Sequence, residues 1–269
     1  MADIITIDDN TDIPEPPPGE SMGLVPRDFS AHPQGYLMCA RPFDLPLMSD
    51  DEIEAAIKRQ AEEKSSPKDV FFREGMAALD QNGQGYCWAY STTSGVMLSR
   101  VIAGLPYVRL SAHMVACIIK GYRDQGGWNA QSVEFVAEHG VAAVGPASEG
   151  GWPEKSMSRS NDTPMMREKA KQHQLVEFMD LDDGGPNLKR QCATCLCNNI
   201  VYPSDHNWWS HSVLAALLRK WGPGGRDFEI EILNSWGSSW SDRGWGVLSG
   251  SKAIPNGAIA IRVSKPSMN

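Results

Sequence analysis

A proline-free run from Cys87 to Ile102 follows a glycine-containing loop, and Gly104 stands just beyond it. This pattern predicts a helix that begins at Cys87 and ends before Gly104. A thiol in the first turn of a helix lies near the positive end of the helix dipole and near free backbone N–H groups, which favour the nucleophilic thiolate. A buried structural cysteine is the alternative interpretation, because free cysteines are commonly buried. The run alone leaves both interpretations open.

A second segment offers the base that a cysteine nucleophile needs. His211 stands in an apolar stretch, residues 208–217, that is typical of a buried strand, and residues 228–233 alternate like a half-buried strand. If these form two antiparallel strands joined by the Gly/Pro-rich turn between them, Asn234 comes to lie beside His211. The Asn234 carboxamide oxygen can then accept a hydrogen bond from one ring nitrogen and leave the other nitrogen facing Cys87.

Two further side chains fit the same chemistry. Gln81 lies on a loop before Cys87 that could bring its side-chain amide beside the sulfur. A neutral N–H donor in that place stabilises the oxyanion that forms when sulfur attacks a carbonyl. Trp236 follows Asn234 closely enough to shield the hydrogen bond to His211 from water.

Four residues occur in the order found in the papain family of cysteine peptidases: Gln81, Cys87, His211 and Asn234. The Gly-Tyr-Cys-Trp-Ala and Asn-Ser-Trp-Gly-Ser-Ser-Trp runs around them also resemble that family. The resemblance implies that Cys87 is the nucleophile and His211 the base. Asn234 would then orient the base, Gln81 would donate to the oxyanion, and Trp236 would cover the Asn–His bond.

The resemblance also implies substrate-binding residues. Gly126 and Gly127 match a glycine pair that hydrogen-bonds the substrate backbone like a strand edge in the family. Trp128 and Ser212 match positions that line its main specificity pocket. These four residues, with Trp236, are therefore the candidate substrate-binding residues.

The chain departs from the family in several respects. Gln84 stands where relatives have a cysteine that bonds the equivalent of Cys117, so the family's first disulfide cannot form here. Tyr86 replaces a small residue beside the nucleophile, which we expect to narrow the cleft. No stretch before Gln81 resembles the family's helical inhibitory prosegment, so we expect control of activity from elsewhere.

Helical patterns come first in this region and strand patterns second, which predicts an α+β fold. The resemblance implies a papain-like two-lobed domain over residues 81–269, with a cleft between the lobes. The helical lobe would span about residues 87–186 and the β-barrel-like lobe about residues 187–265. Residues 191–201 are expected to form a strand of the second lobe.

An N-terminal extension precedes this domain. Residues 23–80 contain a capping box, Ser49 and Glu52, that predicts a surface helix over about residues 50–64. Residues 1–22 carry six acidic residues, four prolines and no basic residue, which predicts a disordered arm. The arm is also a candidate for binding a protein partner, because its Ile-Ile-Thr-Ile run could add a strand to a sheet edge.

Composition argues against several classes of protein. The net charge of −8 over 269 residues disfavours nucleic-acid binding, because phosphates require a basic face. The sequence has no apolar run of about 18 residues that could span a membrane, and its N-terminus does not read as a signal peptide. Six cysteines are too few for a disulfide framework, which favours reduced thiols. We therefore expect a protein of the cytoplasm or associated with a virion, not one secreted by a signal peptide.

One cysteine cluster invites a metal interpretation. A structural zinc site usually needs two paired sets of ligands, and the sequence offers a single set, so we predict no metal and no cofactor. That set is Cys192, Cys195 and Cys197, with His206 nearby. The histidines without a partner pattern are expected at the surface or at caps: His32, His113, His139 and His173.

These patterns predict a cysteine hydrolase, most directly an endopeptidase that acts on a peptide or protein. Two alternatives remain open. The domain could be a structural or assembly part, for example of a bacteriophage virion, with little or no proteolysis. It could also deamidate or transamidate glutamine, because all of these reactions pass through a thioester.

Overall fold

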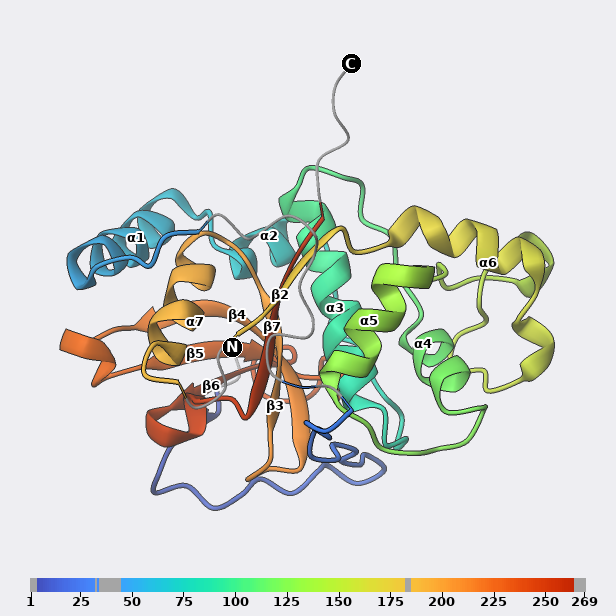
Figure 1. Ribbon diagram of the computed structural model, residues 1–269, viewed down its shortest axis with the longest axis horizontal. Coiled ribbons are helices and arrows are strands. Elements are labelled where there is room, and N and C mark those ends of the chain that lie inside the picture. The colour runs from blue at the N-terminus through green and yellow to red at the C-terminus, as the bar shows by residue number, and fades with distance from the viewer. Residues whose placement is uncertain (1–3, 32, 34–44, 182–184, 264–269) are drawn as a thin grey trace.

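The computed structural model of the protein describes residues 4–31, 33, 45–181 and 185–263. Helices α3 to α6 form a helical part, and the strands form a sheet that α1, α2 and α7 flank, so the fold belongs to the α+β class predicted above (Figure 1). The helices are α1 (Asp50–Glu63), α2 (Pro67–Arg73), α3 (Cys87–Ile102), α4 (Ala112–Ile119), α5 (Asn129–His139), α6 (Pro164–Ala170) and α7 (Leu188–Cys197). The strands are β1 (Thr6–Ile7), β2 (Glu177–Asp180), β3 (Tyr202–His206), β4 (His211–Lys220), β5 (Glu229–Leu233), β6 (Trp245–Ser249) and β7 (Gly257–Arg262).

Helix α3 is the central element, since it packs against α4 and α5 on one side and against β4 on the other. It begins at Cys87, as predicted, and nearly all of its residues are buried. A glycine permits the close packing on the sheet: a Cβ at Gly95 would lie 2.6 Å from the Ile261 side chain and 3.0 Å from that of Leu214. The helix therefore holds Cys87 where the helical part meets the sheet.

The sheet has the strand order β1-β6-β5-β4-β3-β7-β2, and its neighbouring strands are antiparallel except for β1 and β6. Strands β1 and β2 form the two edges, and each pairs with a single neighbour. The sheet is therefore open, and the expectation of a barrel-like lobe needs correction. Its β2 edge comes from residues 177–180, within the stretch expected to be helical.

Buried apolar side chains cover both faces of the sheet, because successive residues of a strand point to opposite sides. On β4, Leu214 and Ala216 join the cluster that contains α3, while Val213 and Ala215 join a second cluster. That second cluster includes side chains of α1 and α7. The predicted capping box is present at Ser49, and α1 begins and ends where the sequence indicates.

Residues 191–201 do not form the expected strand, because residues 188–197 form α7. Leu188, Cys192 and Leu196 follow one another at intervals of four residues and are all buried, which is the period of one helix face. The alternation of Cys195 and Cys197 suggested a strand, but both thiols are buried by packing on the helix. Among the described residues, no group of three or more His, Cys, Asp or Glu side chains could hold a metal ion.

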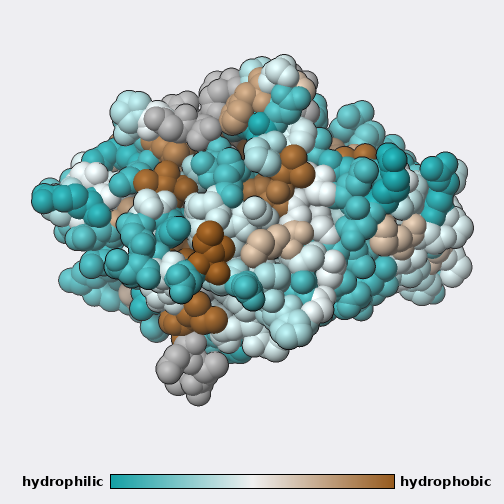
Figure 2. All heavy atoms as spheres, turned by 90° about the horizontal axis from the view of Figure 1, so that it is seen from below, coloured by the Kyte–Doolittle hydropathy of each residue, from teal (hydrophilic) through white to brown (hydrophobic). Residues whose placement is uncertain are grey.

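The N-terminal segment, for which the sequence predicted disorder, lies against the body of the protein. Thr6 and Ile7 pair in parallel with β6, and the Trp209 indole donates a hydrogen bond to the Pro14 carbonyl oxygen at 3.1 Å. Figure 2 shows the lower face of the molecule in Figure 1, where this segment runs: it is mostly hydrophilic, with separate apolar patches. Within the described residues, no helix is both long enough and apolar enough to cross a membrane.

Candidate active site

The register of β4 and β5 brings His211 and Asn234 together. Leu214 pairs with Leu233, so the first residue of β4 lies close to the residue that follows β5. His211 Nε2 and Asn234 Oδ1 are 2.7 Å apart, and both side chains are buried. Since an amide oxygen only accepts, the imidazole donates from Nε2 and keeps the lone pair on Nδ1.

The imidazole of His211 lies in an aromatic surrounding. Its ring centroid is 4.6 Å from that of Trp236 and 4.9 Å from that of Trp209, so both indoles pack against it. Burial lowers the pKa of His211 to about 4, against the opposing effect of the hydrogen bond with Asn234. Within the described part of the chain, Nδ1 has no hydrogen-bond partner. The ring is therefore a neutral base with an unused acceptor.

Cys87 is the first residue of α3, and its side chain is fully buried. Burial raises the pKa of the thiol to about 12, although backbone N–H groups of Ser212, Gly23 and Trp88 hydrogen-bond to the sulfur and act in the opposite direction. The thiol is therefore protonated at neutral pH in this structure. The start of a helix alone does not ionise Cys87, because the sulfur is covered.

The side-chain amide of Gln81 is held in one orientation. Its Oε1 accepts a hydrogen bond from the Ser235 hydroxyl at 2.6 Å, which directs its Nε2 away from Ser235. Nε2 donates to the backbone carbonyl oxygens of Ser21 at 2.8 Å and Gln84 at 2.7 Å. The predicted oxyanion donor thus already binds a peptide carbonyl oxygen, that of Ser21.

Residues 19–25, here called the covering segment, cross the site between the helical part and the sheet. Gly127 N–H donates to the Gly23 carbonyl at 3.0 Å, and Val25 N–H donates to the Gly127 carbonyl at 3.0 Å. On the sheet side, Leu24 N–H donates at 3.1 Å to the carbonyl of Ser210, the residue before His211. Leu24 therefore forms a parallel β-bridge with Gly127, one of the two glycines expected to pair with a substrate backbone.

Glycines make this close approach possible. A Cβ at Gly126 would lie 2.6 Å from the Gly23 carbonyl oxygen, and a Cβ at Gly23 would lie 2.2 Å from the Gly85 carbonyl carbon. Both distances are too short for a side chain. The Trp236 indole also donates to the Ser21 carbonyl oxygen at 3.1 Å. The covering segment was not predictable from the sequence, because backbone contacts with distant residues hold it in place.

The other two predicted substrate-binding residues differ in position. Trp128 precedes α5 and is half-buried, with the Lys120 ammonium 5.6 Å from its ring. Ser212 is fully buried and hydrogen-bonds to Ser91 Oγ at 2.9 Å and to the Ser204 carbonyl at 3.2 Å. Ser212 is therefore part of an interior polar network behind Cys87.

Asp205 belongs to the same network and was missed at the sequence level. It lies on β3 opposite Ser212, is 3% exposed, and accepts a hydrogen bond from the Asn129 backbone N–H at 3.0 Å. Burial raises its pKa to about 7, while the hydrogen bonds from Asn129 and Ser212 and the charge of Arg27 act the other way. Asp205 lies between two apolar segments of strand character, shortly before His211, and this position was the only sequence signal of its burial near the site.

Tyr86 points into the helical part and does not narrow the site, contrary to expectation. Its ring is fully buried, and its hydroxyl donates to the Arg123 carbonyl at 3.0 Å. The same hydroxyl lies 4.0 Å from the sulfur of Cys117, the thiol left without a disulfide partner by Gln84. The described cysteines, Cys87, Cys117, Cys192, Cys195 and Cys197, are all free.

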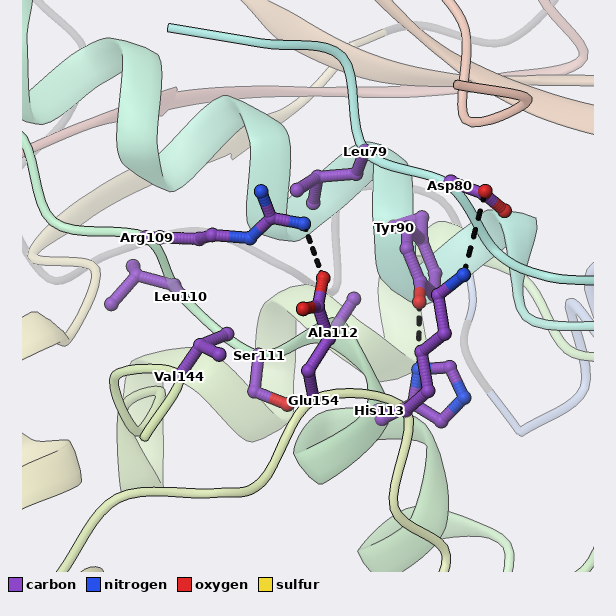
Figure 3. Close-up of a pocket in the computed structure, with 11 residues that line it drawn as sticks. Leu79, Asp80, Tyr90, Arg109, Leu110, Ser111, Ala112, His113, Val144 and Glu154 are labelled. Carbon is purple, nitrogen blue, oxygen red and sulfur yellow. Dashed lines mark hydrogen bonds and ion pairs between the residues drawn. The ribbon is translucent and has the colours of Figure 1, made fainter. Parts of the chain in front are cut away.

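His113 is buried, so its expected surface position is wrong. Its Nδ1 lies 2.6 Å from the Tyr90 hydroxyl, and burial lowers its pKa to about 4. Figure 3 shows Tyr90 and His113 beside a small pocket, across which Arg109 pairs with Glu154. His173 is buried too, whereas His139 is partly exposed and His32 lies outside the described residues.

Neither the family models nor the curated proteins contain a match for the sequence. Several solved structures are similar. Digestive procathepsin L 3 of Tenebrio molitor aligns with a TM-score of 0.55 and 17% identity over 70% of this chain, which spans 66% of that protein. Xylellain, a cysteine protease from Xylella fastidiosa, aligns with a TM-score of 0.55 and 14% identity over 94% of this chain and 99% of its own.

A third similar structure is the proform of the Amb a 11 cysteine protease of ragweed pollen. It has a TM-score of 0.51 and 13% identity over 84% of this chain and 69% of its own. At these identities the likeness concerns the fold. The chain therefore has the fold of the papain-like cysteine proteases.

Proposed function

We propose that the protein is a cysteine endopeptidase with Cys87 as nucleophile and His211 as base. The observation that carries this proposal is the carbonyl oxygen of Ser21 bound to Gln81 Nε2, because an oxyanion donor must hold a peptide carbonyl. The hydrogen bond between His211 and Asn234 adds an oriented base with a free lone pair. A domain with a purely structural role would require none of these groups.

In the proposed reaction, His211 Nδ1 takes the proton of the Cys87 thiol as the sulfur attacks a peptide carbonyl carbon. The Gln81 amide and the Cys87 backbone N–H hold the oxyanion of the tetrahedral intermediate. His211 then gives its proton to the leaving amine, and a water molecule attacks the thioester with His211 as base. Collapse of this second tetrahedral intermediate breaks the C–S bond and releases the carboxylic acid, and His211 returns the proton taken from water to the sulfur.

Peptide bonds fit this site better than glutamine side chains. The hydrogen bonds of Gly127 with Gly23 and Val25 engage a peptide main chain on both sides of Leu24. A glutamine side chain offers one amide and no extended backbone, so it could not use both hydrogen bonds. This contact favours peptide hydrolysis over deamidation.

The covering segment holds the enzyme inactive in this proposal. The backbone N–H of Gly23 hydrogen-bonds to the Cys87 sulfur, so the segment occupies the place that a substrate would need. It also buries the thiol and thereby keeps it protonated. Displacement of residues 19–25 would then admit both substrate and water.

Covalent labelling tests the proposed function. The full chain is incubated with the epoxide inhibitor E-64 and weighed by mass spectrometry, as wild type and with Gly23→Ala, which displaces the covering segment. We expect one adduct on Cys87, faster in the Gly23→Ala protein, and no adduct after Cys87→Ala. An unlabelled folded Gly23→Ala protein, or an adduct that survives Cys87→Ala, would falsify the proposal.

A further inference from the structure

Arg27 follows the covering segment by two residues and enters a buried acidic site. Its guanidinium donates two hydrogen bonds to the carboxylate of Asp180, at 2.9 Å and 2.7 Å. The side chains of this ion pair are 3% and 1% exposed. Two parallel N–H···O hydrogen bonds to one carboxylate recognise a guanidinium by its planar geometry as well as by its charge.

A second carboxylate lies near the first across the sheet. Strand β7 pairs with β2 on one side and with β3 on the other, so it stands between Asp180 and Asp205. Asp205 is opposite Gly257, and the charge of Arg27 lowers its pKa against the larger effect of burial. The guanidinium of Arg27 is therefore within electrostatic reach of both carboxylates.

Asp205 has acceptor capacity that this structure does not use. Its Oδ2 accepts from the Asn129 N–H, but its buried Oδ1 has no hydrogen-bond partner among the described residues. An unsatisfied buried carboxylate oxygen is costly, so its presence calls for an explanation. Asp180 and the Pro33 carbonyl oxygen, at 2.9 Å, already hold the Arg27 guanidinium. Anchoring Arg27 therefore does not require Asp205.

Asp205 also lies close to the catalytic residues. Its charge raises the pKa of the Cys87 thiol, and its partner Asn129 follows Gly127 by two residues. The acidic pair is thus continuous with the backbone contacts that hold the covering segment. A ligand bound along Gly127 could reach it with a long side chain.

We propose that Asp180 and Asp205 form an acidic subsite that selects peptide substrates with an arginine side chain, and that Arg27 occupies this subsite while the covering segment is in place. This inference rests on the proposed peptidase function, because it assumes that substrates bind along Gly127. Asp180 supplies the paired acceptor, as it does for Arg27. Asp205 Oδ1, which Arg27 leaves without a hydrogen bond, accepts an additional N–H from the substrate guanidinium. Asp205 is then a specificity-determining residue.

A binding measurement tests the subsite without the need for turnover. Fluorescein-labelled hexapeptides, alanine-based with one leucine, carry arginine at each position in turn, and a matched set carries citrulline, which has nearly the same shape without the charge. Anisotropy is measured with the full chain carrying Cys87→Ala together with Gly23→Ala. A second protein carries Cys87→Ala with Arg27→Gln, which removes the guanidinium from the subsite. This second protein replaces the first in the measurement if the first fails to fold.

At one peptide position we expect arginine to bind about tenfold or more tightly than citrulline. Adding Asp205→Asn or Asp180→Asn should bring that ratio close to one. Equal binding of the two sets at every position, or no binding of either set to the folded proteins, overturns the inference. An E-64 adduct on Cys87 without any arginine preference would leave the proposed peptidase function standing and remove the acidic subsite alone.

Discussion

At the residue scale, the bond between Asn234 Oδ1 and His211 Nε2 decides which ring nitrogen can act as a base. Asn234→Ala removes the acceptor that fixes this tautomer. We expect the rate of Cys87 alkylation by E-64 to fall about tenfold to a hundredfold, since a lost hydrogen bond of this kind costs about 1.5 to 3 kcal/mol. Rates are compared in the Gly23→Ala background, with exposed Asn10→Ala as the control. Equal rates for both changes would show that Asn234 does not orient the base.

The residues of the site differ in how well the sequence predicted them. Cys87, His211 and Asn234 stand in short motifs whose order is informative, and the structure brings His211 and Asn234 into contact. The charge states were not predictable, because they depend on burial: the thiol and the imidazole are both neutral. Asp205 was missed because its partner Asn129 lies on a distant helix.

At the element scale, we expect the covering segment to determine whether Cys87 can react. Gly23→Ala places a Cβ 2.2 Å from the Gly85 carbonyl carbon, so the segment must move away. Exposure of the thiol lowers its pKa from about 12, and we expect iodoacetamide to alkylate Cys87 at pH 8 at least about tenfold faster. Gly145→Ala is the matched control, because a Cβ there meets no atom within 4 Å. Similar rates for both variants would rule out the covering role.

Regular elements with strong local signals were predictable, and those held by distant contacts were not. The capping box defined α1, and the proline-free run defined α3. The sequence predicts a strand where α7 forms, because the helix is short and its alternating cysteines obscure the four-residue period. The N-terminal segment was expected to be disordered because it is acidic and proline-rich, yet partners such as Gly127 and Ser210 hold its backbone.

At the scale of the whole molecule, the open sheet joins the proposed catalytic residues to the proposed acidic subsite. Strand β4 carries His211, its neighbour β3 carries Asp205, and two strands further on β2 carries Asp180. A single layer therefore sets the spacing between the base and the carboxylates. The same layer buries Asp205 beneath α5, which ties its ionisation to the stability of the entire fold.

The stability of the protein should therefore depend on pH through Asp205. Burial raises its pKa from 3.8 to about 7, so the fold favours the protonated carboxyl, and this contribution is lost as the pH rises from about 4 through 7. Asp205→Asn keeps the shape without the charge. Relative to wild type, its Tm should rise between pH 5 and pH 8 by roughly 4 to 8 °C, on the order of 2 kcal/mol. Exposed Asp12→Asn is the control in calorimetry, and a constant Tm difference across this range would mean that Asp205 is already ionised at pH 5.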